Sequence, residues 1–589
     1  MSQPQILVLD AGGQYCHLIT RKVRELGVYA EVRPSETPAA EMTGARGLII
    51  SGGPSSVYEP GSPTVDPAIF QRGWAMLGIC YGQQLMAHLL NGQVRKGEKG
   101  EYGLAYIERT NPQAPLFAGT PARQQVWMSH RDQVERVPAG FEILARTETC
   151  PVASMGDMAR RLYGVQFHPE VVHTTHGRQI LSNFVLDIAG CRPDWEPKHQ
   201  IAAIEQRIRE AAAGRKVFFF VSGGVDSTVA YFLCRRALGD DRVHGAYVDT
   251  GLMRAGETEF VRGVFERLGA HGFRVVDARR RFLSALAGVR DPEQKRHIIG
   301  EKFVEMQEEI LQTGHFLDAD WILGQGTIYP DTIESGGAAK ADLIKTHHNR
   351  VAGIQRLIAE QRIVEPLSLL YKDEVREIGR ELGLPQELLE RHPFPGPGLA
   401  IRCLCADREE PPLRGEDGWL LPVHSVGVQG DSRSYRPVLV VEDPPWPGGE
   451  AQERATDLIN RNSAINRVIA LVRSRTPFGE MRVRRSELDA GRLERLRAAD
   501  AAVRRLSQES GFEREVWQFP VILIPAGSAD LPDSVVLRPV HSVDGMTARS
   551  VGMPPELLER MAAEVLSVEG VCAVFYDLTH KPPGTIEWE

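Results

Sequence analysis

Short apolar segments that end in glycine turns constrain the fold of this 589-residue chain more than any other feature. Residues 6–9 precede Asp-Ala-Gly-Gly, residues 47–50 precede Ser-Gly-Gly-Pro, and residues 216–221 precede Ser-Gly-Gly and a helical pattern that reaches residue 238. Nearly continuous apolar runs of this length are typical of parallel strands that are buried on both faces. The sequence therefore predicts an α/β fold with doubly wound parallel sheets.

Two proline-rich segments divide the chain. Residues 191–197 and 392–398 interrupt the strand and helix patterns, because proline cannot continue a helix. We therefore predict one doubly wound domain at residues 1–195, a second at 196–395 and a third part at 396–589. In this last part Pro-Val-His-Ser-Val occurs twice, at residues 422–426 and 539–543, each time ahead of a helical segment and a short apolar strand. This repetition predicts a duplicated α+β domain.

Composition excludes several classes of protein. The chain has 69 Lys and Arg against 77 Asp and Glu, so it lacks the basic surplus of a general nucleic-acid binder. No apolar stretch approaches the roughly 20 residues of a membrane helix, and we expect neither nucleic acid nor membrane as a partner. The eight cysteines are scattered without a C-x-x-C pair, which favours a reducing cytoplasm over a disulfide scaffold. Residues 461–505 hold twelve Arg and five acidic residues; a solvated surface is favoured there over a docking site for an anionic partner.

A cysteine between two glycines is the first candidate for chemistry. Cys80 lies in Gly-Ile-Cys-Tyr-Gly, residues 78–82, between an apolar strand and a helix, as in a nucleophile elbow. The positive end of that helix favours the thiolate, although a free cysteine is often only a small buried apolar residue. His168 and Glu170 follow a predicted strand, where an imidazole base and an orienting carboxylate would complete a triad.

These residues resemble the class I glutamine amidotransferases. The resemblance rests on Gly-Ile-Cys-Tyr-Gly-Gln-Gln, on His-Pro-Glu and on residues 127–132, which are similar to a substrate loop of that family. It implies that Cys80 attacks the side-chain amide of glutamine and releases ammonia. It also implies an oxyanion hole made by Gly53 and the amide of Tyr81, and contact between Gln84 and the bound glutamine.

The turn after residue 221 is the second candidate. Its backbone N–H groups and the following helix N-terminus suit phosphate, and the missing Lys-Ser/Thr ending excludes the P-loop of kinases. The segment Ser-Gly-Gly-Val-Asp-Ser-Thr resembles the N-type ATP pyrophosphatases, which cleave ATP between its α and β phosphates. Asp226 is the expected carboxylate for Mg²⁺, which prefers oxygen ligands. The residues assigned to ATP are Ser222, Gly223, Gly224, Val225, Asp226, Ser227 and Thr228.

Segments from residue 5 to the last residue resemble the GMP synthetase family, including residues 248–251, 291–296, 324–331, 345–349, 392–398 and 581–589. The resemblance implies that ATP adenylates the C2 oxygen of XMP, and that ammonia then displaces AMP to give GMP. The residues assigned to XMP are Arg296, Asp431, Gln518, Lys581 and Glu587. Each of these, taken alone, is also typical of a surface salt bridge.

Residues 420–435 resemble the longer synthetases, in which the third domain is present twice. Short forms dimerise through this domain, so we expect either a monomer, in which the two copies satisfy each other, or a homodimer. Two other functions stay open: an adenylating amidotransferase that acts on a nicotinate nucleotide or a transfer-RNA base, and a nucleotide-sensing scaffold without turnover.

Overall fold

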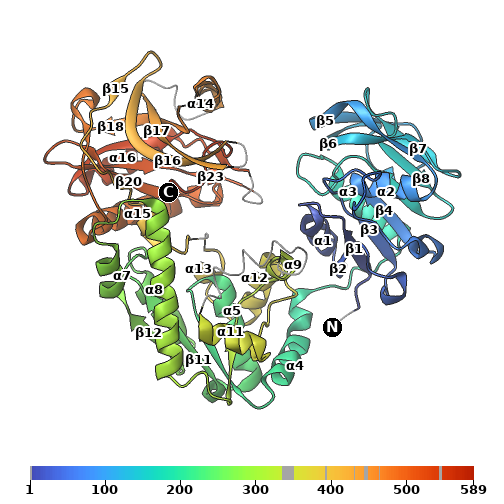
Figure 1. Ribbon diagram of the computed structural model, residues 1–589, viewed down its shortest axis with the longest axis horizontal. Helices are drawn as coiled ribbons and strands as arrows, with labels where there is room; N and C mark the ends of the chain where they lie inside the picture. Colours follow the sequence, from blue (N-terminus) through green and yellow to red (C-terminus); the bar gives the residue numbers. More distant parts are fainter. Residues whose placement is uncertain are drawn as a thin grey trace. The chain divides into compact units, whose positions relative to one another are not determined.

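The computed structural model describes residues 3–334, 351–391, 394–429, 432–442, 449–462, 464–542 and 547–589. The chain divides into two units (Figure 1). The first contains Met1–Ile204 together with Ile328–Ala341 and Leu369–Ile378. The second contains Glu205–Thr327, Asp342–Ser368 and Gly379–Glu589. The three domains predicted from the sequence stay a prediction, because the first unit also contains two later segments of the chain.

One nine-stranded sheet forms the centre of the first unit, in the order β2-β1-β3-β4-β9-β8-β7-β5-β6. The first five strands are parallel, as the apolar runs predict, and the rest are antiparallel. The strands are β1 (Ile6–Asp10), β2 (Ala30–Pro34), β3 (Gly47–Ile50), β4 (Ala75–Ile79), β5 (Gln93–Arg109), β6 (Arg123–Arg136), β7 (Glu142–Arg146), β8 (Ser154–Asp157) and β9 (Leu162–Val165).

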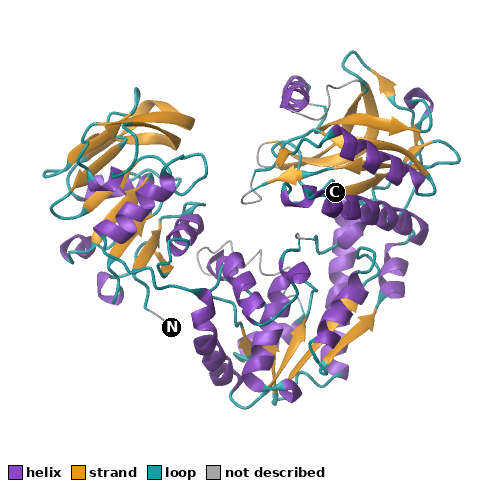
Figure 2. Ribbon diagram, turned by 180° about the vertical axis from the view of Figure 1, so that it is seen from behind, coloured by secondary structure: helices purple, strands orange, loops and turns teal. Residues whose placement is uncertain are grey.

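Helices pack on both faces of this sheet (Figure 2). Successive side chains of a strand point to opposite faces, so Ile6 and Val8 lie in one core while Leu7 and Leu9 lie in the other. Helices α1 (Cys16–Arg24) and α3 (Gly177–Ser182) cover the first core, and α2 (Tyr81–Leu89) covers the second. The doubly wound arrangement predicted for this part of the chain is confirmed.

A buried arginine joins the later segments to the first unit. The guanidinium of Arg24 lies 2.9 Å from the carboxylate of Glu374, in the first turn of α12 (Lys372–Glu381), and it also donates to the carbonyl oxygen of Leu369. Four aromatic rings surround it at 4.9–5.4 Å: Tyr29, Trp195, Tyr329 and Tyr371. The aromatic rings stabilise the guanidinium. Removing either member of the pair would leave the other charge buried and unpaired, which is strongly destabilising. Such contacts between residues hundreds of positions apart explain why the unit is not continuous in sequence.

The second unit begins with a five-stranded parallel sheet in the order β12-β11-β10-β13-β14. Its strands are β10 (Lys216–Phe220), β11 (Val243–Asp249), β12 (Phe273–Asp277), β13 (Trp321–Gly324) and β14 (Ile363–Val364). The helices of the second unit here are α5 (Val225–Leu238), α6 (Glu257–Arg267), α7 (Arg279–Leu286), α8 (Pro292–Thr313), α11 (Ala352–Ala359), α13 (Gln386–Leu389) and most of α4 (Ile201–Ala212), which starts in the first unit. Helix α9 (Tyr329–Glu334) belongs to the first unit. The strand order reverses between β10 and β13, which is where open α/β sheets bind ligands.

A seven-stranded sheet forms the C-terminal part, in the order β15-β16-β17-β18-β25-β22-β20. Its bounds are β15 (Leu413–Arg414), β16 (Trp419–Gln429), β17 (Ser432–Val441), β18 (Arg467–Ser474), β20 (Val521–Ile524), β22 (Asp533–Leu537) and β25 (Val571–Asp577). Two short pairs accompany it, β19 (Arg482–Val483) with β21 (Ala526–Gly527), and β23 (Val540–His541) with β24 (Arg549–Ser550). The helices are α14 (Gly449–Arg461), α15 (Ala490–Ser510) and α16 (Pro555–Ser567).

The C-terminal sheet repeats one topology. An antiparallel pair, a helix and a parallel strand make up β16-β17-α14-β18, and the same order makes up β20-β22-α16-β25. The two halves meet where β18 pairs antiparallel with β25, as a local two-fold arrangement requires. The predicted duplication is therefore confirmed. The repeated pentapeptide is not equivalent in the two halves, because residues 422–426 lie within β16 whereas 539–542 follow β22.

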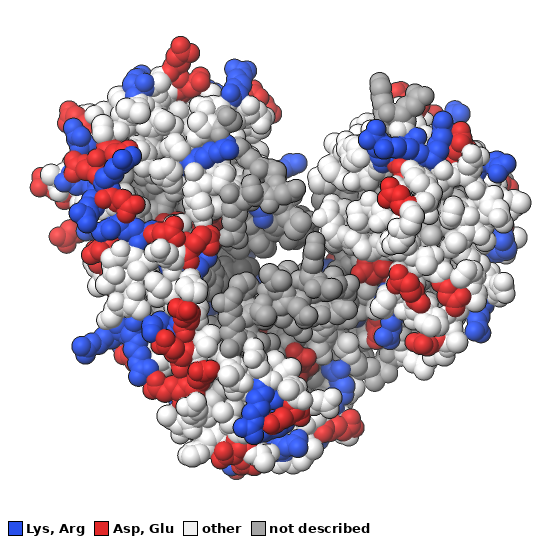
Figure 3. Space-filling model, in the orientation of Figure 1, with Lys and Arg blue, Asp and Glu red and all other residues white. Residues whose placement is uncertain are grey.

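The arginine-rich segment 461–505 is paired with acidic residues from elsewhere in the chain. Arg467 and Arg538 both contact Asp577, at 3.0 and 2.8 Å, with all three side chains inaccessible to solvent. Arg492 and Arg495 share Asp533 at 2.8 and 2.5 Å. Charges of both signs are interspersed on the face drawn in Figure 3. Several arginines of this segment thus stabilise the fold through ion pairs within the chain.

Over the described part of the chain, no helix is both long and apolar enough to cross a membrane.

Candidate active site

Cys80 lies in a strained turn between β4 and α2. Its backbone has φ +52° and ψ −107°, a combination that non-glycine residues rarely adopt. A Cβ on Gly82 would lie 2.2 Å from the carbonyl oxygen of Ile50, and one on Gly78 would lie 2.5 Å from the backbone of Gly82. Both flanking glycines are therefore required by close backbone packing. This turn places the sulfur at the N-terminus of α2, where the predicted elbow lies.

His168 and Glu170 lie beside the cysteine because β4 and β9 are adjacent parallel strands. Ile79 pairs with Val165, so the chain beyond each strand emerges at the same edge of the sheet. His168 Nδ1 and Glu170 Oε1 are 2.7 Å apart, and both side chains are buried. Burial by itself lowers the pKa of His168, but Glu170 and a hydrogen bond with Cys80 outweigh it and raise that pKa to about 10. The imidazole accordingly holds a proton at neutral pH, next to the sulfur.

The glycine turn after β3 lies against the same site. A Cβ on Gly52 would be 3.2 Å from His168 Cε1 and 3.6 Å from Cys80 Cβ. A Cβ on Gly53 would be 2.4 Å from the carbonyl oxygen of Ala11 and 3.5 Å from the ring of Tyr81. The predicted oxyanion residues, Gly53 and Tyr81, therefore lie beside the candidate triad, and a side chain at either glycine would have to displace its neighbours.

Gln84 is buried in this site and its amide nitrogen is already hydrogen-bonded. Gln84 Nε2 donates to the carbonyl oxygen of Asp132 at 2.7 Å and to Gln166 Oε1 at 3.2 Å. Gln166 Nε2 in turn lies 3.6 Å from Cys80 Sγ, and the carbonyl oxygen of Ser129 lies 3.7 Å from the same sulfur. Sequence reasoning missed Gln166. The signal was available, because alternation in a strand places residue 166 on the same side as His168.

The second candidate site lies at the reversal point of the five-stranded sheet. Residues 221–224 follow β10, and α5 begins at Val225 and ends at Leu238, where the sequence pattern predicts its end. Gly223 has φ +80° and packs against Val261, and the hydroxyls of Ser222 and Ser227 lie 3.0 Å apart. A Cβ on Gly326, just after β13, would lie 2.8 Å from the backbone nitrogen of Ser227. Two crossing segments thus form a glycine-lined turn at a helix N-terminus, a geometry that suits phosphate.

The predicted magnesium ligand occupies the first turn of α5. Asp226 is partly exposed there, next to the turn that would hold phosphate. A partly exposed carboxylate beside a phosphate-binding turn has the oxygen chemistry that Mg²⁺ prefers, since this ion usually binds through one or two carboxylates together with substrate phosphates. The donor set therefore fits the predicted ion.

Four of the five residues assigned to XMP are described. Two of them lie in the C-terminal segment, which is held by ion pairs. Glu587 accepts two hydrogen bonds from Arg402, at 2.9 and 2.6 Å. Glu589 pairs with Lys295 at 2.7 Å, and Lys295 directly precedes Arg296 on α8. Gln518 bridges to Val540, and Lys581 bridges to Ala548 next to β24. Asp431 lies outside the described residues, as do residues 345–349 and 392–393 of the segments that carried the resemblance.

A cluster of Glu101, His130 and Cys150 is a further group that sequence reasoning missed. One nitrogen, oxygen or sulfur atom from each lies within 4.8 Å of the others. Burial and the nearby Glu101 raise the pKa of the Cys150 thiol to about 12. No short spacing in the sequence connects these residues, since they come from β5, β6 and the segment between β7 and β8.

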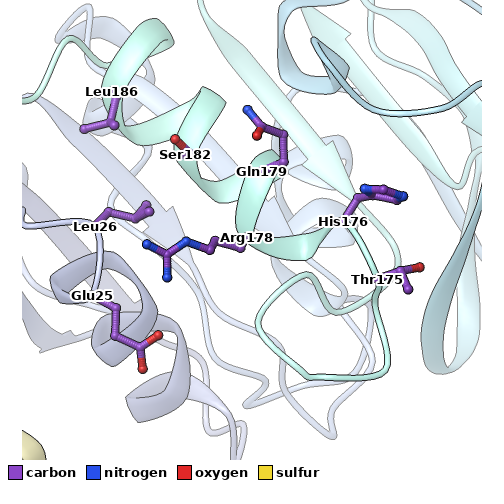
Figure 4. A pocket seen from close by; sticks show the side chains of 8 residues that line it. All are labelled: Glu25, Leu26, Thr175, His176, Arg178, Gln179, Ser182 and Leu186. Atoms are coloured by element: carbon purple, nitrogen blue, oxygen red, sulfur yellow. The ribbon is translucent and has the colours of Figure 1, made fainter.

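A surface cavity of about 460 Å³ lies elsewhere in the first unit (Figure 4). It is lined by Glu25 and Leu26 after α1 and by residues of and around α3, among them Arg178 and Gln179. None of the residues predicted for catalysis lines it. The cavity is therefore separate from the candidate triad.

Together, the elbow of the nine-stranded sheet and the glycine turn after β10 define a glutamine amidotransferase fused to a nucleotide-activating domain. Family models agree with this class: "Glutamine amidotransferase class-I" matches residues 7–188, "NAD synthase" matches 197–282, and "GMP synthase C terminal domain" matches 506–588.

Full-length relatives identify the family. The chain is 41% identical over 601 residues to a GMP synthase [glutamine-hydrolyzing] of Symbiobacterium thermophilum, with all of both chains covered. It is 40% identical over 599 residues to proteins of the same name from Caldicellulosiruptor saccharolyticus and Geobacillus kaustophilus, again with all of both chains covered. The chain belongs to the glutamine-hydrolysing GMP synthases.

Proposed function

We propose that this chain converts XMP into GMP with nitrogen from glutamine and energy from ATP. The observation that carries the proposal is the strained Cys80 elbow beside the His168–Glu170 pair, in the same chain as a glycine turn at the reversal point of a parallel sheet. The match of residues 506–588 to the GMP synthase C-terminal domain favours XMP over a nicotinate nucleotide or a transfer-RNA base. The intact triad geometry favours an enzyme over a scaffold.

In the glutaminase step, the proton of the Cys80 thiol passes to His168, and the sulfur attacks the side-chain carbonyl carbon of glutamine. The backbone amides of Gly53 and Tyr81 stabilise the oxyanion. His168, which holds a proton at neutral pH, donates it to the departing nitrogen, so that ammonia leaves and a thioester remains. Water then hydrolyses the thioester to glutamate and frees the cysteine. Glu170 keeps the imidazole oriented throughout.

In the synthetase step, the C2 oxygen of XMP attacks the α phosphorus of ATP, and pyrophosphate leaves. Residues 222–228 hold the phosphates through backbone N–H groups and the positive end of α5. Asp226 would hold Mg²⁺, which neutralises phosphate charge when it is bound. Ammonia then attacks C2 of the adenylated base, and AMP leaves. Arg296, Gln518, Lys581 and Glu587 are our proposed contacts to XMP, together with Asp431.

We also propose that the enzyme works in the reducing cytoplasm, because its eight cysteines are all free thiols and seven of them are buried.

The test of the function separates the two nitrogen sources. In an assay with XMP, ATP and magnesium that follows XMP absorbance, Cys80→Ala should abolish GMP formation from glutamine and leave GMP formation from added ammonia near the wild-type rate. Asp226→Asn should lower both rates, because both require adenylation. Equal loss of both activities in Cys80→Ala, or absence of GMP in the wild type, would contradict the proposal.

A further inference from the structure

A buried histidine–carboxylate contact involves the segment that carries Ser129 and Asp132. Glu101 on β5 and His130 on β6 are directly opposite each other in the antiparallel register. Their side chains are 13% and 3% exposed, and His130 Nε2 lies 3.2 Å from Glu101 Oε2. Neither residue touches Cys80, so the proposed reaction does not use them directly.

Each ring nitrogen of His130 faces one oxygen atom. Its Nδ1 lies 3.0 Å from the carbonyl oxygen of Asp132, and its Nε2 faces the carboxylate of Glu101. A carbonyl oxygen only accepts hydrogen bonds, so the contact with Asp132 is a hydrogen bond in which Nδ1–H is the donor. Glu101 Oε1 receives the hydroxyls of Thr147, at 2.6 Å, and Thr149. Burial raises the pKa of Glu101, but hydrogen bonds from His130 and these hydroxyls outweigh it and lower that pKa.

The atoms that a metal ion would need are already in contact with other groups. Each ring nitrogen of His130 faces an oxygen atom, and each oxygen of Glu101 has a hydrogen-bonding partner. Although Cys150 completes a set of N, O and S atoms, the geometry favours a histidine–carboxylate pair that orients its neighbours.

The pair orients the carbonyl group of Asp132, whose oxygen also accepts a hydrogen bond from Gln84. Gln84 Nε2 uses its two hydrogens on Asp132 O, at 2.7 Å, and on Gln166 Oε1, at 3.2 Å. Gln166 Nε2 continues the path to Cys80 Sγ at 3.6 Å. With both Nε2 hydrogens engaged, only Gln84 Oε1 is left for a ligand, and an oxygen acceptor suits the α-ammonium group of an amino acid.

We propose that His130, held by Glu101, is a positioning residue for glutamine binding. It fixes the carbonyl group of Asp132, and this carbonyl holds the side-chain amide of Gln84 in one orientation. In that orientation the amide oxygen of Gln84 faces the ammonium group of the substrate. This inference rests on the proposed glutaminase function and deepens it. If the amide of Gln84 flipped, its oxygen would face the carbonyl oxygen of Asp132, and two acceptors would repel each other. Loss of the contact between His130 and Asp132 should therefore weaken glutamine binding rather than the reactivity of the thiol.

Two substitutions of His130 separate its two contacts. In His130→Asn, the side-chain nitrogen replaces Nδ1 and keeps the donor to Asp132 O. In His130→Gln, the nitrogen replaces Nε2 and keeps the contact to Glu101 only. We expect the KM for glutamine to rise at least tenfold in His130→Gln and less than threefold in His130→Asn, with kcat changed less than KM. GMP formation from ammonia should stay at the wild-type rate in both, which checks folding.

Thiol labelling gives an independent readout. The His130→Gln variant should react with iodoacetamide at the wild-type rate. It should react with a chloroketone analogue of glutamine at least tenfold more slowly than the wild type, because only this reagent needs the contact to its ammonium group. Equal KM values in the two variants, or parallel loss of both labelling rates, would overturn the positioning role. A wild-type enzyme that forms GMP from ammonia but not from glutamine would instead refute the proposed function, which keeps the two failures distinguishable.

Discussion

At the scale of single residues, the candidate triad combines a strained backbone with a shifted pKa. Cys80 has φ +52°, which costs of the order of 1–3 kcal/mol and persists only where the surrounding structure imposes it. His168 is buried, yet Glu170 and Cys80 keep its pKa at about 10. The proton that departing ammonia requires is therefore present over the physiological range. This property depends mainly on one carboxylate, 2.7 Å from the ring.

Replacing that carboxylate should change the pH dependence of glutamine hydrolysis. In Glu170→Gln the main influence that raises the pKa of His168 is lost, so the imidazole loses its proton at a lower pH than in the wild type. We expect the alkaline limb of the kcat/KM profile to move to lower pH, and the rate at pH 7.5 to fall by about 10²-fold. The profile of the ammonia-dependent reaction is the control. An unchanged alkaline limb would mean that His168 does not supply the proton.

At the scale of elements, the elbow depends on how closely α2 approaches β3. Gly82 lies in the first turn of α2, and its missing side chain lets the helix backbone contact the carbonyl oxygen of Ile50. The Gly-x-Cys-x-Gly pattern predicted the turn, but the contact that makes Gly82 necessary comes from a strand more than 30 residues earlier. Gly263 in α6 offers a contrast, because a Cβ there meets no atom within 4 Å.

These two helical glycines should respond oppositely to the same substitution. Gly82→Ala places a Cβ 2.2 Å from a backbone oxygen, so α2 must move and glutamine-dependent activity should fall by about 10²-fold, as expected for a misplacement of about 1 Å. Gly263→Ala should leave both activities unchanged and stabilise the protein by about 0.5–1 kcal/mol. Enzyme assays and urea unfolding provide the measurements. A fully active Gly82→Ala variant would show that the elbow tolerates the displacement.

At the scale of the whole molecule, the C-terminal sheet is made of two copies of one β-β-α-β topology within a single chain. The copies pair through β18 and β25, so the contact between the two copies is made within one chain. The buried Asp577, shared by Arg467 and Arg538, ties the same region together, since removal of a buried charge partner is strongly destabilising.

This internal pairing predicts a monomer. Because β18 and β25 already satisfy each other's hydrogen bonds, neither strand can pair with a second chain. Sedimentation at low micromolar concentration should give the mass of one chain, with and without ATP and XMP. A stable dimer at that concentration would contradict the prediction and favour the homodimer that the sequence left open.

The sequence by itself determined the features that depend on local order. Apolar runs followed by glycines gave the parallel strands, and the spacing around Cys80, His168 and Ser222 indicated the chemistry, because turns and helix starts are encoded by neighbouring residues. Only the tertiary structure brought Glu101 opposite His130, placed Gln166 against Cys80, caged Arg24 among four aromatic rings and paired the arginines of residues 461–505 with distant acids. These contacts join positions tens to hundreds of residues apart. Their partners are chosen by the packing of whole sheets, and no local pattern in the chain records that choice.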